Sequence, residues 1–194
     1  AYVRYDHEAL VGILALEAQR AGAVVIGEDL GVVEPMARQF LLERGILGTS
    51  ILWFEWGEDG RPLAPERYRD LCLTAVTTHD LPPTAGYLQL EHVAIRERLH
   101  LLTRAVDEER AIESAAIDQI KHLLTERSLL GEDPTIDDVV VALHRLISMT
   151  PSRMLLAALA DLVGDRRAIN QPGTEDEYPN WRLPLADAHG RILL

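Results

Sequence analysis

The sequence contains little cysteine and no long apolar run, and each absence excludes a class of protein. Cys72 is the one cysteine among 194 residues, so no disulfide can form within the chain, as is usual in the cytoplasm. We expect Cys72 to be a small buried residue. No apolar run reaches the ~20 residues that a membrane-spanning helix needs. Residues 1–10 also lack the basic and apolar regions of a signal peptide. The sequence therefore predicts a cytoplasmic protein that binds no membrane.

Basic residues are also scarce. Lys and Arg number 19 against 31 Asp and Glu, which gives a formal charge of −12 at pH 7. An acidic surface gains nothing from nucleic acid or from an anionic membrane, so we expect neither as a partner. A neutral small molecule or a sugar fits this charge better. The apolar fraction of 47% is high enough for one domain with its own core.

The chain alternates short β-branched apolar runs with helical stretches, which is typical of βα units around a parallel sheet. The expected strands span residues 23–26, 49–56 and 74–81, with a fourth apolar run that ends near Asp161. The expected helices span 7–22 (capped by Asp6), 34–44, 65–71, two stretches within 91–129, and 137–147 (capped by Thr135 and Asp138). A closed (β/α)8 barrel has eight strands and roughly 250 residues. Four strands therefore predict an α/β fold that is the C-terminal half of such a barrel.

The expected organisation is a single partial domain over residues 1–194. It contains a helical insertion at about 91–133 and a tail at 165–194 that is either an ordered loop or a disordered end. The charged run at 107–114 is expected to be a solvent-exposed helix face.

Because the chain has no initiator Met and starts beside a helix, we expect it to be a piece of a longer protein. A half-barrel leaves two strand edges open, and open edges favour pairing with another copy of the chain.

Two of the expected strands end in a carboxylate, Glu28 in VVIGEDL and Asp80 in TAVTTHDLP. Parallel α/β barrels build active sites at the carboxyl ends of their strands, so these two acids predict one shared site. Such a pair can perform acid–base chemistry on a glycosidic bond. Two alternatives stay open: either acid can cap the following helix, or Glu28, His79 and Asp80 can bind a metal. No metal-ligand spacing supports the second alternative.

Aromatic residues gather near the expected strand ends, and flat rings suit the apolar faces of sugars. They are Trp53, Phe54, Trp56, Tyr68 and Tyr87, with Trp181 in the tail. We take Trp53 as a candidate sugar contact, together with Asp29, the neighbour of Glu28. Because side chains alternate along a strand, Glu28 and Asp29 face opposite ways, and Trp53 or Phe54 can belong to the core instead.

Three segments carry a family resemblance: GEDLG at 27–31, TTHDLPPTAGY at 77–87 and NQPGTEDEYPNW at 170–181. Together, and in this order, they resemble the C-terminal half of the 4-α-glucanotransferases of glycoside hydrolase family 77, the amylomaltases or disproportionating enzymes. The resemblance covers nearly the whole chain. It implies a (β/α)8 barrel, α-1,4-glucans such as maltodextrin, maltose and glucose as substrates, and no metal or organic cofactor.

The resemblance also implies a role for each matching residue. Glu28 matches the general acid/base, Asp80 the acid that stabilises the transition state, and His79 a ligand of a substrate hydroxyl. Asn170 matches a segment near the sugar subsites. The family's nucleophilic Asp belongs to an Arg-x-Asp-His motif upstream of the Glu, and residues 4–7 only superficially resemble that motif.

The function expected on this basis is retaining transfer of an α-1,4-glucan segment to the 4-hydroxyl of an acceptor glucan or glucose. Because Asp6 is expected to cap a helix, the nucleophile is expected outside this chain, and the isolated chain is expected to be inactive. Two alternatives remain: an α-glucan hydrolase on the same scaffold and a non-catalytic glucan-binding module.

Overall fold

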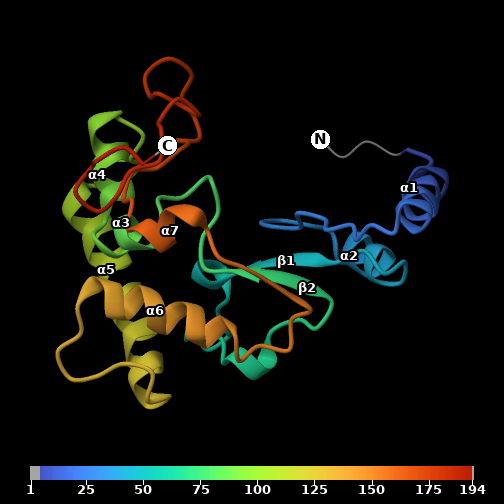
Figure 1. The fold of residues 1–194 in the computed structure, drawn as a ribbon, viewed down its shortest axis with the longest axis horizontal. Helices are drawn as coiled ribbons and strands as arrows, with labels where there is room; N and C mark the ends of the chain where they lie inside the picture. Colours follow the sequence, from blue (N-terminus) through green and yellow to red (C-terminus); the bar gives the residue numbers. More distant parts are fainter. Residues whose placement is uncertain (1–4, 194) are drawn as a thin grey trace.

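The computed structural model describes residues 5–193, so Arg4 of the candidate motif at 4–7 lies outside the described residues. Figure 1 shows a central sheet with α1 and α2 on one side and α3 to α7 on the other. The elements are α1 (His7–Ala21), α2 (Pro35–Leu42), β1 (Gly48–Ile51), η1 (Leu52–Phe54), η2 (Pro65–Arg67), β2 (Cys72–Ala75), α3 (Thr84–Leu88), α4 (Glu91–Arg98), α5 (Val106–Glu126), α6 (Ile136–Ile147), β3 (Met154–Leu156) and α7 (Leu159–Val163).

The sheet has three strands in the order β1-β2-β3, and both pairs are parallel. Gly48 pairs with Cys72 at the start of β1, and Ala75 pairs with Leu156 at the end of β2. Because all strands run the same way, their carboxyl ends meet at one edge of the sheet. The expected α/β class with a parallel sheet is therefore confirmed, with three strands rather than four.

The first expected strand, at 23–26, is reduced to a single parallel bridge between Ile26 and Leu47. Its backbone bonds join Leu47 to the carbonyl of Val25 and Gly27 to the carbonyl of Leu47, at 3.0 and 2.7 Å. The ladder then stops because the side chain of Asp29 accepts the backbone N–H of Thr49 at 2.8 Å. A carboxylate thus takes the place of the next backbone carbonyl.

The other expected strands are also shorter than their apolar runs. The run at 49–56 leaves the sheet at Leu52, where the backbone tightens into the 3-10 turn η1. The run at 74–81 leaves it after Ala75, and Thr77 then donates its hydroxyl to the carbonyl of Pro82 at 3.0 Å.

The fourth run gives only β3, and Asp161 lies in α7 rather than at a strand end. The helix expected at 65–71 is likewise only the three-residue turn η2.

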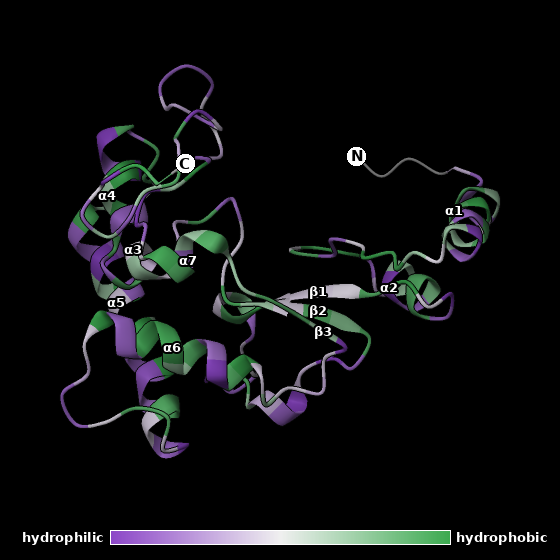
Figure 2. Ribbon diagram, viewed as in Figure 1, coloured by the Kyte–Doolittle hydropathy of each residue, from purple (hydrophilic) through white to green (hydrophobic). Residues whose placement is uncertain are grey.

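Local capping signals gave the boundaries of α1 and α6 correctly to within one residue. Asp6 accepts the N–H of Ala9 at 3.1 Å at the start of α1, and Gly22 ends that helix with a φ of 62°, a conformation that glycine adopts without strain. Thr135 and Asp138 form the expected reciprocal capping box of α6. Figure 2 shows α6 alternating between hydrophobic and hydrophilic stretches, as expected of a helix with one buried face.

The core lies where β1, β2, α3, α5 and α6 meet, and Leu124, Leu143 and Leu146 are its largest fully buried aliphatic side chains. Cys72 is a free, fully buried thiol, as expected. Among the described residues, α1 and α2 contribute no buried side chain. None of the helices within 5–193 is both long enough and apolar enough to cross a membrane.

The charged run 107–114, expected to be a solvent-exposed helix face, is exposed only in part. Glu109 is only 6% exposed because Arg96 and Arg104 contact its two carboxylate oxygens at 3.3 and 3.1 Å. Glu113 accepts the hydroxyl of Tyr87 at 2.9 Å and is half-buried. These carboxylates join α5 to α3 and α4, so part of the charged run belongs to the packing.

Helix α3 packs closely on the segment that follows α7. At Gly86 a side-chain carbon would overlap the backbone carbonyl of Arg166, and backbone atoms cannot move aside as the end of a flexible side chain can. Gly86 is therefore required by close approach rather than by an unusual φ.

We predict that Gly86→Ala destabilises the chain by roughly 1–3 kcal/mol, because overpacking against fixed backbone outweighs the helix propensity that alanine gains. The free energy of unfolding in urea measures this loss. Gly131→Ala is the matched control, since an added carbon there meets nothing within 4 Å. Equal stability of the two variants would contradict the close packing at Gly86.

Candidate active site

Three of the candidate site residues come together in the loop after β2 and the C-terminal tail. Asn170 donates its side-chain amide to Asp80 Oδ1 at 2.7 Å, although the two residues are 90 positions apart. His79 Nε2 lies 3.4 Å from the same oxygen. The side chains of His79 and Asp80 are 50% and 47% exposed. The group therefore presents a carboxylate, an imidazole and an amide to solvent.

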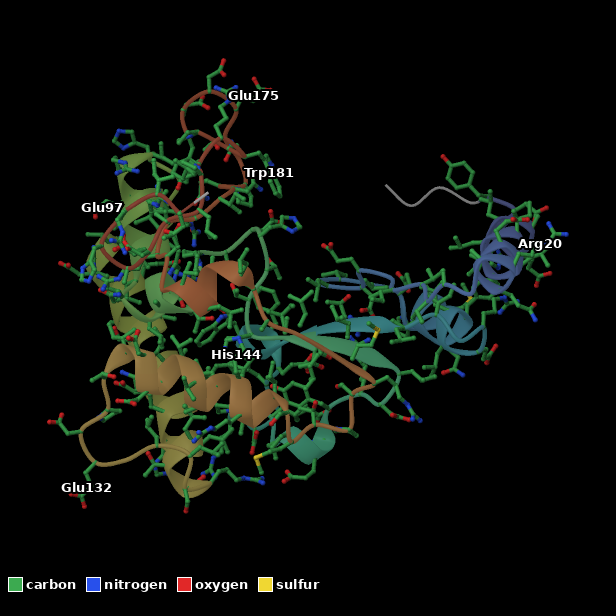
Figure 3. The ribbon with its side chains drawn as sticks, in the orientation of Figure 1. Arg20, Glu97, Glu132, His144, Glu175 and Trp181 are labelled. Atoms are coloured by element: carbon green, nitrogen blue, oxygen red, sulfur yellow. The ribbon has the colours of Figure 1, made fainter. Side chains whose placement is uncertain are left out.

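An aromatic ring lies beside this group. The centroid of the Trp181 indole is 5.3 Å from that of the His79 imidazole, and Trp181 is 61% exposed. Figure 3 shows Trp181 on the C-terminal loop. Its backbone has a φ of 60° and donates to the carbonyl of Ile169 at 2.8 Å, which holds the ring next to Asn170. An exposed ring beside polar groups is a suitable surface for a sugar.

The loop that carries Asp80 is held at both ends. Thr78 Oγ1 accepts the N–H of Asp80 at 3.1 Å, and the hydroxyl of Thr77 bonds to the carbonyl of Pro82. On the tail side, Asn180 Oδ1 accepts the N–H of Gln171 at 2.8 Å. Short local bonds and one long-range bond thus fix the position of Asp80.

Glu28 and Asp29 face opposite ways, as strand alternation predicts. Glu28 is exposed, and within residues 5–193 its carboxylate makes neither a hydrogen bond nor an ion pair. Asp29 is 6% exposed. Glu28 therefore presents its carboxylate to solvent from the segment that forms a parallel bridge to Leu47, just before β1.

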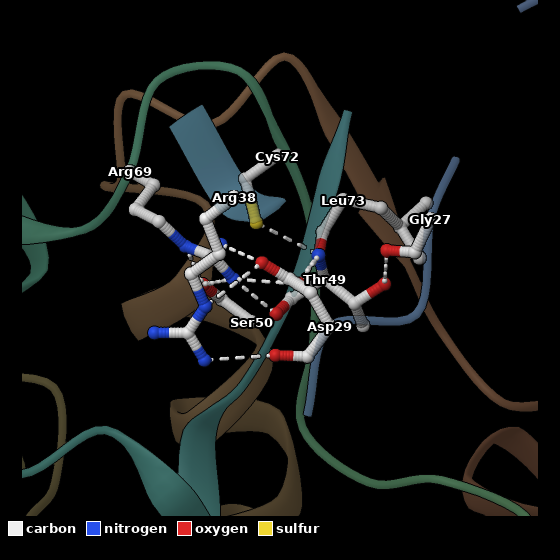
Figure 4. Close-up of polar contacts among 8 residues, drawn as sticks. All are labelled: Gly27, Asp29, Arg38, Thr49, Ser50, Arg69, Cys72 and Leu73. Carbon is white, nitrogen blue, oxygen red and sulfur yellow. Dashed lines mark hydrogen bonds and ion pairs between the residues drawn. The ribbon is translucent and has the colours of Figure 1, made fainter. Parts of the chain in front are cut away.

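Asp29, the expected substrate contact beside Glu28, is turned toward the chain itself. Both of its oxygens are occupied by the chain itself: Arg69 contacts Oδ2 at 2.5 Å, Arg38 lies 3.4 Å from the same oxygen, and Oδ1 accepts from Thr49 (Figure 4). Burial alone would raise the pKa of Asp29. The hydrogen bonds from Arg69 and Thr49 and the charges of both arginines outweigh it and hold that pKa below its usual range.

Trp53, the candidate sugar contact, lies in the core, which is the alternative that the sequence left open for it. It is 5% exposed and stacks on Tyr87, with ring centroids 4.2 Å apart. Tyr87 in turn stacks on His92 at 4.2 Å. Trp53 is therefore the first ring of a buried stack in the core, whereas Phe54, its neighbour, is 53% exposed. The alternation of side chains left both assignments open, and tertiary packing decides between them.

A cavity of about 370 Å³ lies against the base of the Asp80 loop. Its lining includes His79, Leu81 and Pro83 from that loop, with Leu159 and Ile169 from the opposite side. Among residues 5–193 no group of three or more His, Cys, Asp or Glu side chains could hold a metal ion.

The sequence pattern did not reveal the residues that hold the site in place. Arg69, which pairs with Asp29, follows a short turn and belongs to no motif. Asp161 accepts hydrogen bonds from Thr84, 77 positions away, and its apolar surroundings conceal it in the sequence. No signal of spacing or periodicity could have found either partner, because both contacts depend on the tertiary fold.

Comparison with known proteins gives a consistent result. A family model described as 4-alpha-glucanotransferase matches residues 1–188. A 4-alpha-glucanotransferase of Mycobacterium tuberculosis is 57% identical over the whole of this chain, and one of Haemophilus influenzae is 28% identical over 96% of it. The chain spans 28% of the length of each of these relatives.

Two solved structures share the fold. The amylomaltase of Corynebacterium glutamicum matches all of this chain at 47% identity with a TM-score of 0.94, and the match covers 29% of that chain. The amylomaltase of Streptococcus agalactiae in complex with acarbose matches 87% of this chain with a TM-score of 0.56. At 19% identity the second likeness concerns the fold alone.

We predict that Asp29→Asn lowers the free energy of unfolding at pH 7 by about 2 kcal/mol, because it removes charge-assisted bonds to Arg69 and Thr49. The folded pKa of Asp29 is depressed, so its contribution is present above the unfolded pKa of about 3.9. It is lost as the pH falls from there through the folded value. The gap between wild type and variant should therefore close below about pH 4.

Urea titrations at pH 7 and in the acid range measure this gap. Glu28→Gln, one position away, is the matched control and should leave stability within about 0.5 kcal/mol, because the Glu28 side chain faces solvent. A pH-independent loss in Asp29→Asn would contradict the ionic role.

Proposed function

This chain belongs to the 4-alpha-glucanotransferase family, and from that premise we propose that it supplies part of the active site of a 4-α-glucanotransferase. The reaction is the retaining transfer of an α-1,4-glucan segment to the 4-hydroxyl of an acceptor glucan or glucose. Substrates of this class are neutral, which suits a chain with a formal charge of −12.

The observation that carries the proposal is the group formed by His79, Asp80 and Asn170. A half-exposed carboxylate, with an amide at 2.7 Å and an imidazole at 3.4 Å, offers both acceptors and donors for the hydroxyls of one sugar ring. The exposed Trp181 ring beside it suits the apolar face of a neighbouring sugar. In this proposal Asp80 and His79 hold the ring at the cleavage point, and the charge of Asp80 stabilises the positive charge that develops there.

Glu28 is the proposed general acid/base. Its carboxylate is free of partners within the described residues, so a proton can enter and leave it without breaking an ion pair. In the first step a nucleophilic carboxylate from outside residues 1–194 bonds to the anomeric carbon, the bond from that carbon to the leaving oxygen breaks, and Glu28 gives its proton to that oxygen. In the second step Glu28 takes the proton of the acceptor 4-hydroxyl, whose oxygen displaces the nucleophile.

The proposed architecture is the C-terminal half of a (β/α)8 barrel. The parallel order of segment 25–27, β1, β2 and β3 supports it. The strand residues Met154, Leu155 and Leu156 are 38–47% exposed, so within this chain both faces of β3, the outermost strand, are only partly covered. The same open edge could pair two copies of the chain when it is expressed alone. A cytoplasmic location remains a proposal based on the single free thiol.

We predict that the isolated chain does not disproportionate maltotriose, because double displacement stops without a nucleophile. Incubating the purified chain with maltotriose and separating the products by chromatography measures this activity. Glucose and longer maltodextrins formed by the chain, free of contaminating enzyme, would contradict the assignment of the nucleophile to another segment. Binding of malto-oligosaccharide that survives Glu28→Gln together with Asp80→Asn would instead favour a non-catalytic binding module.

Activity can be tested in a chimeric enzyme, in which residues 1–194 replace the matching stretch of the Mycobacterium tuberculosis relative. We predict that Glu28→Gln and Asp80→Asn each lower kcat for disproportionation by roughly 10²–10⁴-fold, because one removes proton transfer and the other a charge facing the transition state. Product profiles with and without added glucose separate transfer from hydrolysis.

The matched controls are Glu34→Gln and Asp118→Asn, which make the same chemical changes at exposed positions without side-chain partners among residues 5–193. Both should keep the wild-type rate. If Glu28→Gln or Asp80→Asn also kept it, the proposed role of that residue would be wrong.

A further inference from the structure

We propose that Asp161 is a positioning residue for the catalytic loop, defined here as residues 77–84. The inference rests on the proposed function, since it concerns how His79 and Asp80 are held for the reaction. Asp161 lies in α7, and no family motif or site assignment above includes it. Its role follows from what its carboxylate contacts.

Both oxygens of Asp161 bind the same residue at the end of the catalytic loop. Oδ1 accepts the backbone N–H of Thr84 at 2.6 Å, and Oδ2 accepts the Thr84 hydroxyl at 2.7 Å. Thr84 is fully buried, and the Asp161 side chain is only 1% exposed. A two-point contact between buried groups fixes both the position and the rotation of Thr84.

The loop transmits this constraint toward Asp80. Pro82 and Pro83 separate Thr84 from Leu81, and each proline fixes its own φ, so this half of the loop has few conformations. Thr77, at the other end, bonds to the carbonyl of Pro82 at 3.0 Å. Moving Thr84 therefore moves the backbone that supports Asp80.

The rest of the segment after Asp161 holds the same stretch of chain. Arg166 packs its carbonyl against Gly86 and donates its guanidinium to Gln89 at 3.0 Å, and Asn170 contacts Asp80 itself. Segment 161–170 thus lies alongside residues 80–89 and contacts both ends of that stretch. Asp161 is the buried end of this contact and Asn170 the exposed end.

Helix α6 also reaches the carboxylate. His144 Nε2 lies 3.6 Å from Asp161 Oδ2, while its Nδ1 lies 2.8 Å from the carbonyl of Val140 on the same helix. Figure 3 shows His144 on the part of α6 that faces α7. Three helices, α3, α6 and α7, therefore converge on one buried carboxylate directly behind the catalytic loop.

The consequence for catalysis is geometric. Displacement of a catalytic group by about 1 Å can cost about 10²-fold in rate even when the substituted residue is distant from the reacting atoms. Asp161→Leu, which keeps the branched shape of the side chain but removes both acceptors, should lower kcat of the chimeric enzyme by about 10²-fold. Thr84→Val, which loses only the hydroxyl contact, should cost about tenfold, with KM changed by less than about threefold in both variants.

Two controls separate positioning from general stability. Thr84→Ser keeps the hydroxyl and should restore most of the wild-type kcat. Thr135→Ala removes the capping box of α6 and should cost about 1 kcal/mol of stability without changing kcat. If Asp161→Leu lowers the melting temperature but leaves kcat unchanged, as Thr135→Ala does, the positioning role is wrong.

Asp80→Asn in the same assay distinguishes this inference from the proposed function. If Asp80→Asn abolishes turnover and Asp161→Leu does not, the inference fails and the proposed function stands. If Asp80→Asn has no effect, the proposed function fails.

In that case the inference is tested on the isolated chain, by the NMR chemical shift of the Asn170 side-chain amide. Positioning predicts that Asp161→Leu moves this signal toward that of a free amide while Thr84→Ser does not, and an unchanged signal overturns it.

Discussion

The buried carboxylate of Asp29 determines how the N-terminal part of the chain joins the sheet. It accepts the N–H of Thr49 and pairs with Arg69, so the segment that carries Glu28 is fixed to β1 by a side chain rather than by a longer ladder. Because Asp29 points inward, Glu28 must point outward. The proposed acid/base therefore faces solvent as a consequence of the pairing of its neighbour.

A second buried carboxylate acts in the same way on the other side of the sheet. Asp161 holds Thr84 at the end of the loop that carries His79 and Asp80, and Asn170 contacts Asp80 from the same segment. In both places a carboxylate satisfies a backbone donor that regular structure leaves free, the N–H of Thr49 in β1 and the N–H of Thr84 at the start of α3. Rigid support of this kind allows an exposed loop to keep its side chains in one arrangement.

The sequence alone predicted the features that depend on neighbouring residues. The helix ends at Asp6, Gly22 and Thr135 follow local capping chemistry and were correct. Strand lengths were overestimated, because contacts such as that of Asp29 with Thr49 end the ladder and have no signature in the sequence. The charged run at 107–114 was misjudged for a similar reason, since the partners of Glu109 come from α4 and from the loop before α5.

The candidate site was predictable to the extent that motifs carry it. The family resemblance supplied His79, Asp80 and Asn170, and the structure brings these three together. It did not supply Asp161, and it could not show that Trp53 and Asp29 are buried, because their burial depends on the tertiary fold.

The most direct test is a crystal structure of the chimeric enzyme with bound acarbose. We expect Asp80 and His79 within hydrogen-bond distance of hydroxyls on one ring, with Glu28 at the atom that links this ring to the next. A complex in which the ligand occupies another surface, and these three side chains contact only protein or solvent, would contradict it.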